Sequence, residues 1–509
     1  MDKRKGIINV LVSIFFRIFM LIGSILVRRF LIQYIGNEVN GLDSLYTSLI
    51  GFLTVAELGV GSAITFCMYK PIVEQDDAKV AALYQLFTKS YRLIGMIMMV
   101  VGVCLIPVLP YLAKDYIQLD VNLGLTFLLM LCSVVLSYAF SAKTSLINAY
   151  KNNYVTTSIS STGMIVQYGL QIIAIITTKS FTIYLCCRIV AMLLQWGITE
   201  VYSYKNYKSI LTHNKELVDE TTKKEIVNKV KALFMHRIGG VLVNSADGII
   251  ISAFIGVVVL GKFSNYSSIA VSMSSVIALA FSPLTSIIGH AYVSEKEKTE
   301  QYFQKFYFLN FFLGVVFFLG YYAVIDDLVL ILFGNNLSLS KSVSFVVATN
   351  YFVQFMRQST LLFRDATGTF YNDRWKPFFE GILNVILSVI FVKLFASIGG
   401  DELGVVGVIV ATIFTNIFIC HIVEPYVLYK YAFQTSVKRH LIQNYVYIGL
   451  FIISAFIVSM LMQAYENKWI ELFVNGAISL AISACVISLT FLCNKNMRIW
   501  VRNKCRRKR

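Results

Sequence analysis

Charged residues are scarce in this sequence, because aspartate, glutamate, lysine and arginine make up only 14% of its 509 residues. A water-soluble domain carries roughly 25%, so a soluble chain of this length would lack the charges to cover its surface. Prolines number only 6, and no long run of serine, glycine or proline occurs, which excludes a largely disordered chain. The composition is 57% hydrophobic, and the apolar residues recur in runs along the whole length. We therefore expect an integral membrane protein.

Signatures of catalysis and of metal binding are also missing. The nine cysteines are scattered without the spacing of zinc ligands, and the five histidines are dispersed. Neither HExxH nor GxSxG occurs. Residues 256–263 nearly spell a phosphate loop, but Phe263 stands where serine or threonine must hold the metal ion. We expect no catalytic residue, no metal site and no cofactor.

Apolar segments long enough to span a bilayer recur about fourteen times. A helix needs about 20 predominantly apolar residues to cross the hydrocarbon core, so the fold is expected to be all-α and polytopic. The basic residues 1–5 run directly into the first segment, which predicts an uncleaved first helix rather than a signal peptide. The predicted spans are 7–29, 43–67, 91–112, 122–142, 157–177, 181–203, 231–253, 266–289, 306–325, 343–363, 378–398, 404–428, 441–463 and 470–493.

Positive charge alternates along this layout. If the N-terminus is cytoplasmic, 33 of the 45 lysines and arginines fall in cytoplasmic segments and 7 in outer segments. This is the pattern of the positive-inside rule, and it predicts a multi-pass protein of the cell membrane with both termini in the cytoplasm. The basic tail NKCRRKR permits a nucleic-acid role, but every cytoplasmic segment is basic. We therefore assign the positive charge to topology and anionic lipid, and expect no nucleic-acid partner.

The sequence contains an internal repeat. At an offset of 220 residues, YIGNEVNGLDSLYTS (34–48) aligns with FIGVVVLGKFSNYSS (254–268), and seven of the fifteen positions are identical. Further matches follow at similar offsets, including Glu200 over Glu424. Duplicated halves with an even number of spans keep the same orientation in the membrane, and in transporters such halves enclose a central cavity. An old duplication in a protein with another task is the alternative interpretation.

The repeat defines the expected domain organisation. The two repeated halves would be six-helix lobes, followed by two additional helices. The segments are an N-terminal lobe (1–204), a cytoplasmic linker (205–230), a C-terminal lobe (231–430), two further spans (431–493) and a basic cytoplasmic tail (494–509).

This combination resembles a known family. The segment RRFLIQYIGNEVNGLDSLYTSLIGFLTVAELGVGSAI (28–64), the segment NSADGIIISAFIG (244–256) and the loop FRDATGTFYNDRWKP (363–377) resemble the polysaccharide flippases of the multidrug/oligosaccharidyl-lipid/polysaccharide exporter superfamily. The resemblance implies a flippase that carries an oligosaccharide on a polyprenyl diphosphate from the inner to the outer leaflet, for surface polysaccharide synthesis. It also implies glycosyltransferases and a glycan polymerase as partners in the same process.

Arginines inside the predicted spans are the first candidates for a binding site, because charge at the bilayer centre is costly and is usually retained for function. Arg17 lies near the middle of the first span, and the repeat places it over Arg237. Ser24 is likewise placed over Asn244, and Arg17, Ser24 and Arg28 share one helix face. One arginine from each lobe would then face a common cationic cavity. Guanidinium groups suit a diphosphate, because they bind phosphate with two parallel hydrogen bonds and stay charged.

Further charged residues lie in other spans. Arg188 and Arg357 are candidates for the same cavity, whereas Arg28 is also placed to reach the outer interface. The acids most enclosed by apolar neighbours are Glu57 and Asp247. Either would bind a coupling proton or sodium ion, or would form a static ion pair with the arginine of the first span. Both alternatives stay open from the sequence alone.

Two other functions compete with the flippase. A multidrug or cation exporter of the same superfamily would need acidic and aromatic side chains in the cavity, whereas the charges found at mid-membrane are mainly arginines. A membrane-embedded glycosyltransferase or polymerase would normally need large outer loops with acidic or histidine clusters, and the outer loops here are short. The flippase is the leading hypothesis.

Overall fold

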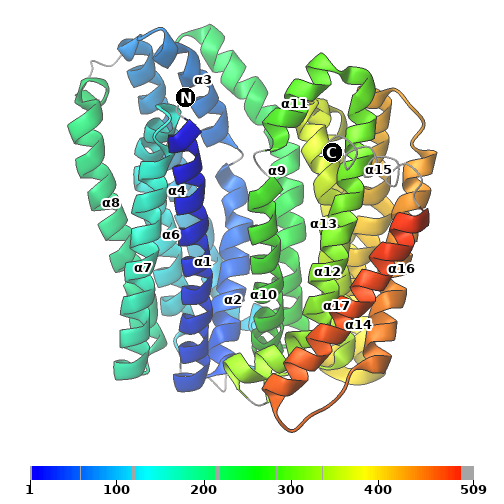
Figure 1. Ribbon diagram of the computed structural model, residues 1–509. Coiled ribbons are helices and arrows are strands. Elements are labelled where there is room, and N and C mark those ends of the chain that lie inside the picture. The colour runs from blue at the N-terminus through cyan, green and yellow to red at the C-terminus, as the bar shows by residue number, and fades with distance from the viewer. Residues whose placement is uncertain are drawn as a thin grey trace. The chain divides into compact units, whose positions relative to one another are not determined.

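The computed structural model describes residues 3–57, 59–116, 121–212, 218–281, 284–334 and 336–493, and it is helical in each of these ranges, with no β-strand (Figure 1). Helices are expected here, because a membrane leaves every backbone polar group to be satisfied within its own segment. The all-α fold is confirmed. Among the described residues, eight helices are long and apolar enough to cross a membrane, or nine if the bent pair α2 and α3 forms one span. The number fourteen stays a prediction.

The helices follow the predicted segments closely. Short 3-10 turns occupy residues 54–57, 106–108, 296–298 and 369–373, and two π-helical turns occupy Asn416–Cys420 and Tyr429–Phe433. The α-helices are α1 (Lys3–Tyr34), α2 (Asn37–Leu53), α3 (Val60–Val73), α4 (Asp77–Leu105), α5 (Leu109–Leu112), α6 (Leu123–Ala149), α7 (Asn153–Thr178), α8 (Phe181–Thr212), α9 (Glu220–Phe254), α10 (Val257–Phe281), α11 (Leu284–Ser294), α12 (Thr299–Phe333), α13 (Lys341–Ala366), α14 (Lys376–Thr415), α15 (His421–Leu428), α16 (Lys438–Leu461) and α17 (Lys468–Cys493).

The first of two compact units comprises residues 1–261 and 377–385. Within it α8 packs against both α6 and α7, α4 packs against α6, and α2 packs against α9 (Figure 1). Buried apolar residues such as Leu45 and Phe127 fill the contacts between these helices. Tyr46 is also fully buried, and its hydroxyl bonds the Leu123 carbonyl oxygen at 3.2 Å and Thr126 at 3.0 Å. The unit is therefore a helical bundle with a small number of satisfied polar groups.

The second unit comprises residues 262–376 and 386–509, and it is built around α12. The helices α13, α16 and α17 pack against α12. Stacked rings fill the core, with the Phe311 and Tyr447 centroids 3.9 Å apart and those of Phe352 and Phe451 also 3.9 Å apart. On α17 only the small or polar Asn475, Ser479 and Ser483 are buried, while apolar residues on its other faces are exposed. An apolar outer face of this kind is compatible with lipid and not with water.

The structure repeats a turn at the offset found in the sequence. Both Gly36 and Gly256 have a positive φ, of 131° and 145°, which few residues other than glycine adopt. The Gly36 amide donates to the Leu31 carbonyl oxygen at 3.1 Å, and the Gly256 amide donates to Ile251 at 3.0 Å. Each pair of positions is separated by 220 residues. The turns α1–α2 and α9–α10 thus have the same geometry, which confirms the aligned register.

The last part of the duplicated region is irregular. Residues 376–415 are helical except at Gly399 and at Gly400, where φ is 78°, and this break falls between the predicted spans 378–398 and 404–428. Beyond it, π-helical turns lie on both sides of the short helix α15, which contains Pro425. A π-helical turn accommodates an extra residue and is frequent at functional sites. This irregular segment carries the buried acid described next.

Candidate functional site

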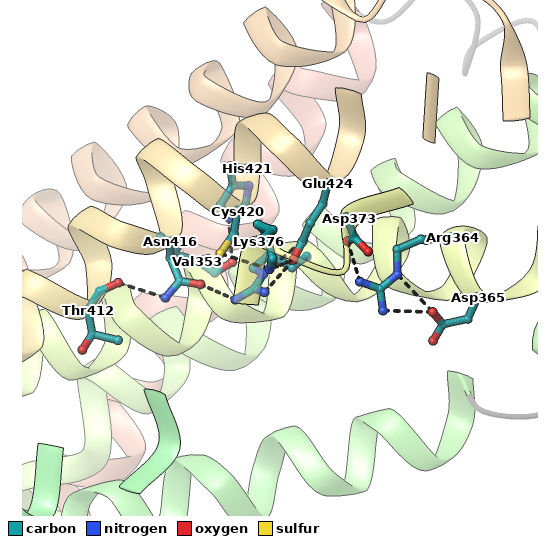
Figure 2. Close-up of polar contacts among 11 residues, drawn as sticks. Val353, Arg364, Asp365, Asp373, Lys376, Thr412, Asn416, Cys420, His421 and Glu424 are labelled. Atoms are coloured by element: carbon teal, nitrogen blue, oxygen red, sulfur yellow. Dashed lines mark hydrogen bonds and ion pairs between the residues drawn. The ribbon is translucent and has the colours of Figure 1, made fainter. Parts of the chain in front are cut away.

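A buried carboxylate in the second unit is shared by two cations (Figure 2). We call Arg357, Lys376 and Glu424 the Glu424 triad. Arg357 comes from α13, Lys376 is the first residue of α14, and Glu424 lies on α15. Pro377, in the first turn of α14, suits a helix start because its missing N–H has no partner there in any case. Three helices therefore converge on the triad.

The contacts of the Glu424 triad are direct and short. Arg357 forms two parallel hydrogen bonds with the carboxylate, from Nε to Oε2 at 3.1 Å and from Nη2 to Oε1 at 2.6 Å. Lys376 Nζ donates to Oε1 of the same carboxylate at 2.5 Å. The side chain of Glu424 is 1% exposed, that of Lys376 is 4% exposed and that of Arg357 is 15% exposed. The triad has a formal charge of +1, and Arg357 is its most accessible member.

Polar neighbours hold the Glu424 triad in place. Arg357 Nη1 donates to Oδ1 of Asn416, whose own amide donates to the Thr412 carbonyl oxygen at 2.9 Å. Asn416, Cys420 and Glu424 are spaced four residues apart, and all three side chains reach the two cations. The Cys420 sulfur lies 3.5 Å from Lys376 Nζ. The π-helical turn 416–420 thus presents polar side chains toward the triad.

His421 extends the polar network away from the triad. Its Nε2 lies 3.0 Å from the Val353 carbonyl oxygen, and its Nδ1 lies 3.0 Å from Oδ1 of Asn444. The Tyr307 hydroxyl donates to the same Asn444 oxygen at 2.5 Å. This network joins α12, α13, α15 and α16 through buried polar side chains.

A second cluster near the Glu424 triad has the opposite balance of charge. Arg364 donates to Asp365 at 3.0 Å and to Asp373 at 2.9 Å, so one cation faces two carboxylates (Figure 2). Asp373 is fully buried, whereas Asp365 is exposed. These bonds close the loop between α13 and α14. Arg364 therefore pairs with two carboxylates, whereas Arg357 shares one carboxylate with Lys376.

The first unit contains another carboxylate with two cations near it. Arg188 Nη2 donates to both oxygens of Asp43, at 2.9 and 3.1 Å, and to the Tyr184 hydroxyl at 3.2 Å. Arg28 lies within electrostatic reach of Asp43 and Arg188. We call Arg28, Asp43, Tyr184 and Arg188 the Asp43 cluster. Its formal charge is also +1, and the Arg188 Nε is buried without a hydrogen-bond partner.

Asp43→Asn tests the energetic role of this cluster. We expect the substitution to lower the free energy of unfolding by about 2 kcal/mol, because a charged hydrogen-bond acceptor is lost while both arginines stay in place. Chemical denaturation of the purified protein in detergent measures the change. Glu74→Gln is the control, because Glu74 is half exposed and lies 3.9 Å from an exposed lysine, and we expect a change below about 0.5 kcal/mol. Equal effects of the two substitutions would contradict this role.

The structure brings three of the predicted arginines into ion clusters. Arg188 binds Asp43, and Arg28 lies within electrostatic reach of both. Arg357 pairs with Glu424. In the sequence, Glu424 was notable only because the repeat aligns it with Glu200. Asp43 and Lys376 do not stand out in the sequence, because Asp43 is the first residue of a predicted span and Lys376 lies just before one. A charged residue at the end of a hydrophobic segment is read as part of the adjacent loop when spans are predicted from hydropathy.

The remaining candidates lie elsewhere. Ser24 is exposed, and its hydroxyl donates to the Leu21 carbonyl oxygen at 2.8 Å. Glu57 accepts a hydrogen bond of 2.6 Å from the Tyr91 hydroxyl. Asp247 is half-buried on α9. The side chains of Arg17, Arg237 and Asn244 lie outside the described residues.

The repeat position of Glu424 also carries an acid that forms an ion pair. In the first unit Lys143 on α6 pairs with Glu200 on α8, and Glu200 is the repeat position of Glu424. The Glu200 side chain is 45% exposed and has one cation, whereas Glu424 is buried and has two. No group of three or more potential metal ligands occurs among the described residues. The Glu424 triad therefore differs from the pair at its repeat position in both burial and the number of cations.

Two cavities lie away from these clusters, one in the described part of each unit. A cavity of about 490 Å³ in the first unit lies between α3, α4 and α9, with both cations and acids such as Lys70, Lys79 and Asp219 at its lining. A cavity of about 400 Å³ in the second unit lies between α11, α12 and α13 and is mainly apolar. Neither cavity is lined by a residue that the sequence predicted for substrate binding.

Comparisons with known proteins address the fold. No family model matches the sequence, and no curated protein matches it. The lipid II flippase MurJ, in an inward closed conformation, is similar in structure with a TM-score of 0.64 and 11% identity, over 95% of this chain and 99% of that one. An inward-facing multidrug resistance MATE family transporter of the MOP superfamily is similar with a TM-score of 0.59 and 12% identity, over 80% of this chain and 96% of that one. The chain therefore has the fold of these two membrane proteins, the fold that the resemblance in sequence implied.

Proposed function

We propose that this protein is a flippase that moves a polyprenyl-diphosphate-linked oligosaccharide from the cytoplasmic to the outer leaflet of the cell membrane, for the synthesis of a surface polysaccharide. The observation that carries the proposal is a pair of ion clusters, one in each unit, in which cations outnumber acids. Each unit contains a carboxylate with two nearby cations, in the Asp43 cluster and in the Glu424 triad. Charge inside membrane helices is usually retained for function, and a cluster in which cations outnumber acids favours an anionic substrate.

A diphosphate on a lipid suits these cations for two reasons. Guanidinium binds phosphate oxygens with two parallel hydrogen bonds and does not lose its charge. The prenyl chain stays in the hydrocarbon of the bilayer, so only the diphosphate and the sugar need a polar path. One of the two structures of similar fold is named as a flippase of lipid II, which supports a lipid-linked substrate.

The proposed cycle is alternating access. In this mechanism duplicated halves rock about a central binding site, which opens first to one side of the membrane and then to the other. With both termini in the cytoplasm, most of the basic residues face anionic lipid on that side. We assign Arg17, Arg237, Arg28, Arg188, Arg357, Ser24 and Asn244 to the cationic path, and Glu57 and Asp247 to ion coupling.

Two substitutions test the proposed path. We expect Arg17→Ala and Arg237→Ala each to abolish surface polysaccharide while the protein stays in the membrane, because each removes the cation that one repeat supplies for the diphosphate. Immunoblotting of the polymer and of the membrane fraction measures both outcomes. Arg29→Ala is the control, because Arg29 is exposed one residue after Arg28, and we expect normal polymer from it. Normal polymer from all three variants would contradict the proposal.

A multidrug or cation exporter is the second candidate, favoured by the similarity to a MATE family transporter. A cationic drug would require acids and aromatic rings at the binding site, whereas the Asp43 cluster and the Glu424 triad both have more cations than acids. Deletion of the gene distinguishes the two functions. Loss of surface polymer with unchanged drug susceptibility supports the flippase, and increased susceptibility with normal polymer supports the exporter.

A further inference from the structure

We propose that Arg357 is an exchangeable anion-binding residue, on which a phosphate group of the substrate replaces Glu424 while Lys376 remains bound to Glu424. The feature behind this inference is the sharing of one carboxylate by two buried cations. The identity of the anion as a lipid diphosphate rests on the proposed function. The exchange itself rests only on the geometry of the triad.

The second cation is what makes the exchange feasible. In a simple buried ion pair, an incoming anion that takes the arginine leaves the carboxylate unpaired, which is strongly unfavourable. In the Glu424 triad, Lys376 Nζ lies 2.5 Å from Glu424 Oε1 and is itself almost fully buried. Glu424 therefore keeps a neutralising partner when Arg357 leaves it. Arg357 can therefore exchange the carboxylate of Glu424 for a phosphate, and neither Glu424 nor Arg357 is left buried without an opposite charge.

Arg357, rather than Lys376, is the cation that exchanges. Its side chain is 15% exposed, against 4% for Lys376, so an anion reaches it first. Its guanidinium has a planar fork that matches phosphate as well as carboxylate. Asn416 stays bound to Nη1 of Arg357 and holds the guanidinium in place when Glu424 leaves it.

The helix that carries Glu424 is suited to a small displacement. The helix α15 is only eight residues long and is bounded by the π-helical turns 416–420 and 429–433. Such turns hold an extra residue, interrupt the regular α-helical hydrogen bonds and are frequent at functional sites. Pro425 also removes one backbone hydrogen-bond donor from α15. Glu424 thus moves relative to Arg357 at the expense of few regular helical bonds.

Other ion clusters of the chain show that the arrangement is specific. Arg364, on the same helix as Arg357, faces two carboxylates, so no cation is released there. The pair Lys143–Glu200 has a single cation and a half-exposed acid. Only the Asp43 cluster, among the described clusters discussed above, repeats the combination of one acid and two cations.

The exchange predicts opposite effects of two substitutions on anion affinity. The probe is inorganic pyrophosphate, titrated by calorimetry into the full-length protein in lipid nanodiscs. Lys376→Met leaves Arg357 and Glu424 as a neutral, closed pair, and we expect the affinity to fall by about tenfold or more. Glu424→Gln removes the competing carboxylate from Arg357, and we expect the affinity to rise by about threefold or more. The double variant K376M/E424Q also lacks the competing carboxylate, and we expect it to bind pyrophosphate at least as tightly as the original protein.

Lys143→Met is the matched control, because it removes the same charge from a pair that has no second cation. We expect its affinity to stay within about twofold of the original value. A purely structural triad would instead make Lys376→Met and Glu424→Gln both weaken binding, with no recovery in the double variant. If Glu424→Gln does not fold, the double variant K376M/E424Q decides, because the exchange predicts a recovery of affinity over Lys376→Met and a purely structural triad predicts none. An unchanged affinity in Lys376→Met would overturn the exchange.

The same variants separate this inference from the proposed function. If pyrophosphate affinity follows the expected order but the original protein does not move a lipid-linked oligosaccharide in vesicles, the exchange stands and the proposed substrate is wrong. If the original protein moves the lipid while Lys376→Met binds pyrophosphate normally, the flippase stands and the exchange is wrong.

Discussion

Gly41→Ala is expected to lower the free energy of unfolding by about 3 kcal/mol. At this position the start of α2 lies directly against the start of α10. A Cβ atom would overlap the Val257 carbonyl oxygen and lie 2.8 Å from its carbon and 3.1 Å from the Gly261 nitrogen. These are backbone atoms, which cannot rotate away as a flexible side chain would. Relief would require α2 to move away from the turn between α9 and α10.

Two side chains make that movement more costly. Asn37 Nδ2 donates to the Val258 carbonyl oxygen at 2.8 Å, and Asn40 Nδ2 donates to the Gly261 carbonyl oxygen at 3.0 Å. Displacement of α2 would stretch both bonds. Chemical denaturation in detergent measures the loss of stability. Gly197→Ala is the control, because no atom lies within 4 Å of its Cβ position, and we expect a gain of up to about 1 kcal/mol from helix propensity. Similar values for the two variants would show that the close approach is not maintained.

Glu424→Gln is expected to be the most destabilising substitution at the Glu424 triad, by about 3–5 kcal/mol. The neutral amide leaves Arg357 and Lys376 buried without a negative charge between them. Glu200→Gln changes the corresponding position of the repeat, where the side chain is 45% exposed, and we expect a loss below about 1 kcal/mol. A larger loss of stability in Glu424→Gln than in Glu200→Gln would show that the burial of the carboxylate, and not its position in the repeat, determines the effect.

Lys376→Met completes this comparison, since it removes a buried charge and leaves one balanced pair. We expect the stability of this variant to stay close to that of the original protein, because Arg357 still neutralises Glu424 and no buried charge loses its partner. The same denaturation experiment measures all three variants. A loss in Lys376→Met as large as that in Glu424→Gln would mean that the triad is needed as a whole for folding.

Hydropathy predicted the helices but not all of their breaks. Each predicted span falls on a helix or on a closely spaced pair of helices, and the break at Gly399 and Gly400 lies between two predicted spans. The span predicted at 43–67 is instead divided, because α2 ends at Leu53 and α3 begins at Val60. Gly59 there has a positive φ of 74°. Because apolar residues continue across this bend, a hydropathy profile shows one uninterrupted span there.

The sequence predicted two arginines of the candidate site but not the acids with which they form ion pairs. Arg188 and Arg357 stand out as charges inside apolar runs, and this property is local in sequence. Their acids, Asp43 and Glu424, lie 145 and 67 residues away, and only the packing of the helices brings them together. Lys376 precedes its span and resembles an ordinary cytoplasmic lysine. Its burial follows from the closure of the α13–α14 loop by Arg364 and Asp373, which no local pattern indicates.

Transport in a defined membrane tests the proposed function most directly. The purified protein would be placed in liposomes that contain a polyprenyl diphosphate carrying a fluorescently labelled oligosaccharide in both leaflets. A reductant that does not cross the membrane is then added outside, and the quenched fraction of the fluorescence is followed with time. We predict a quenched fraction well above that of protein-free liposomes, with a slower rise for Arg17→Ala and Arg237→Ala. A quenched fraction equal to that of protein-free liposomes, from correctly folded protein, would contradict the proposed function.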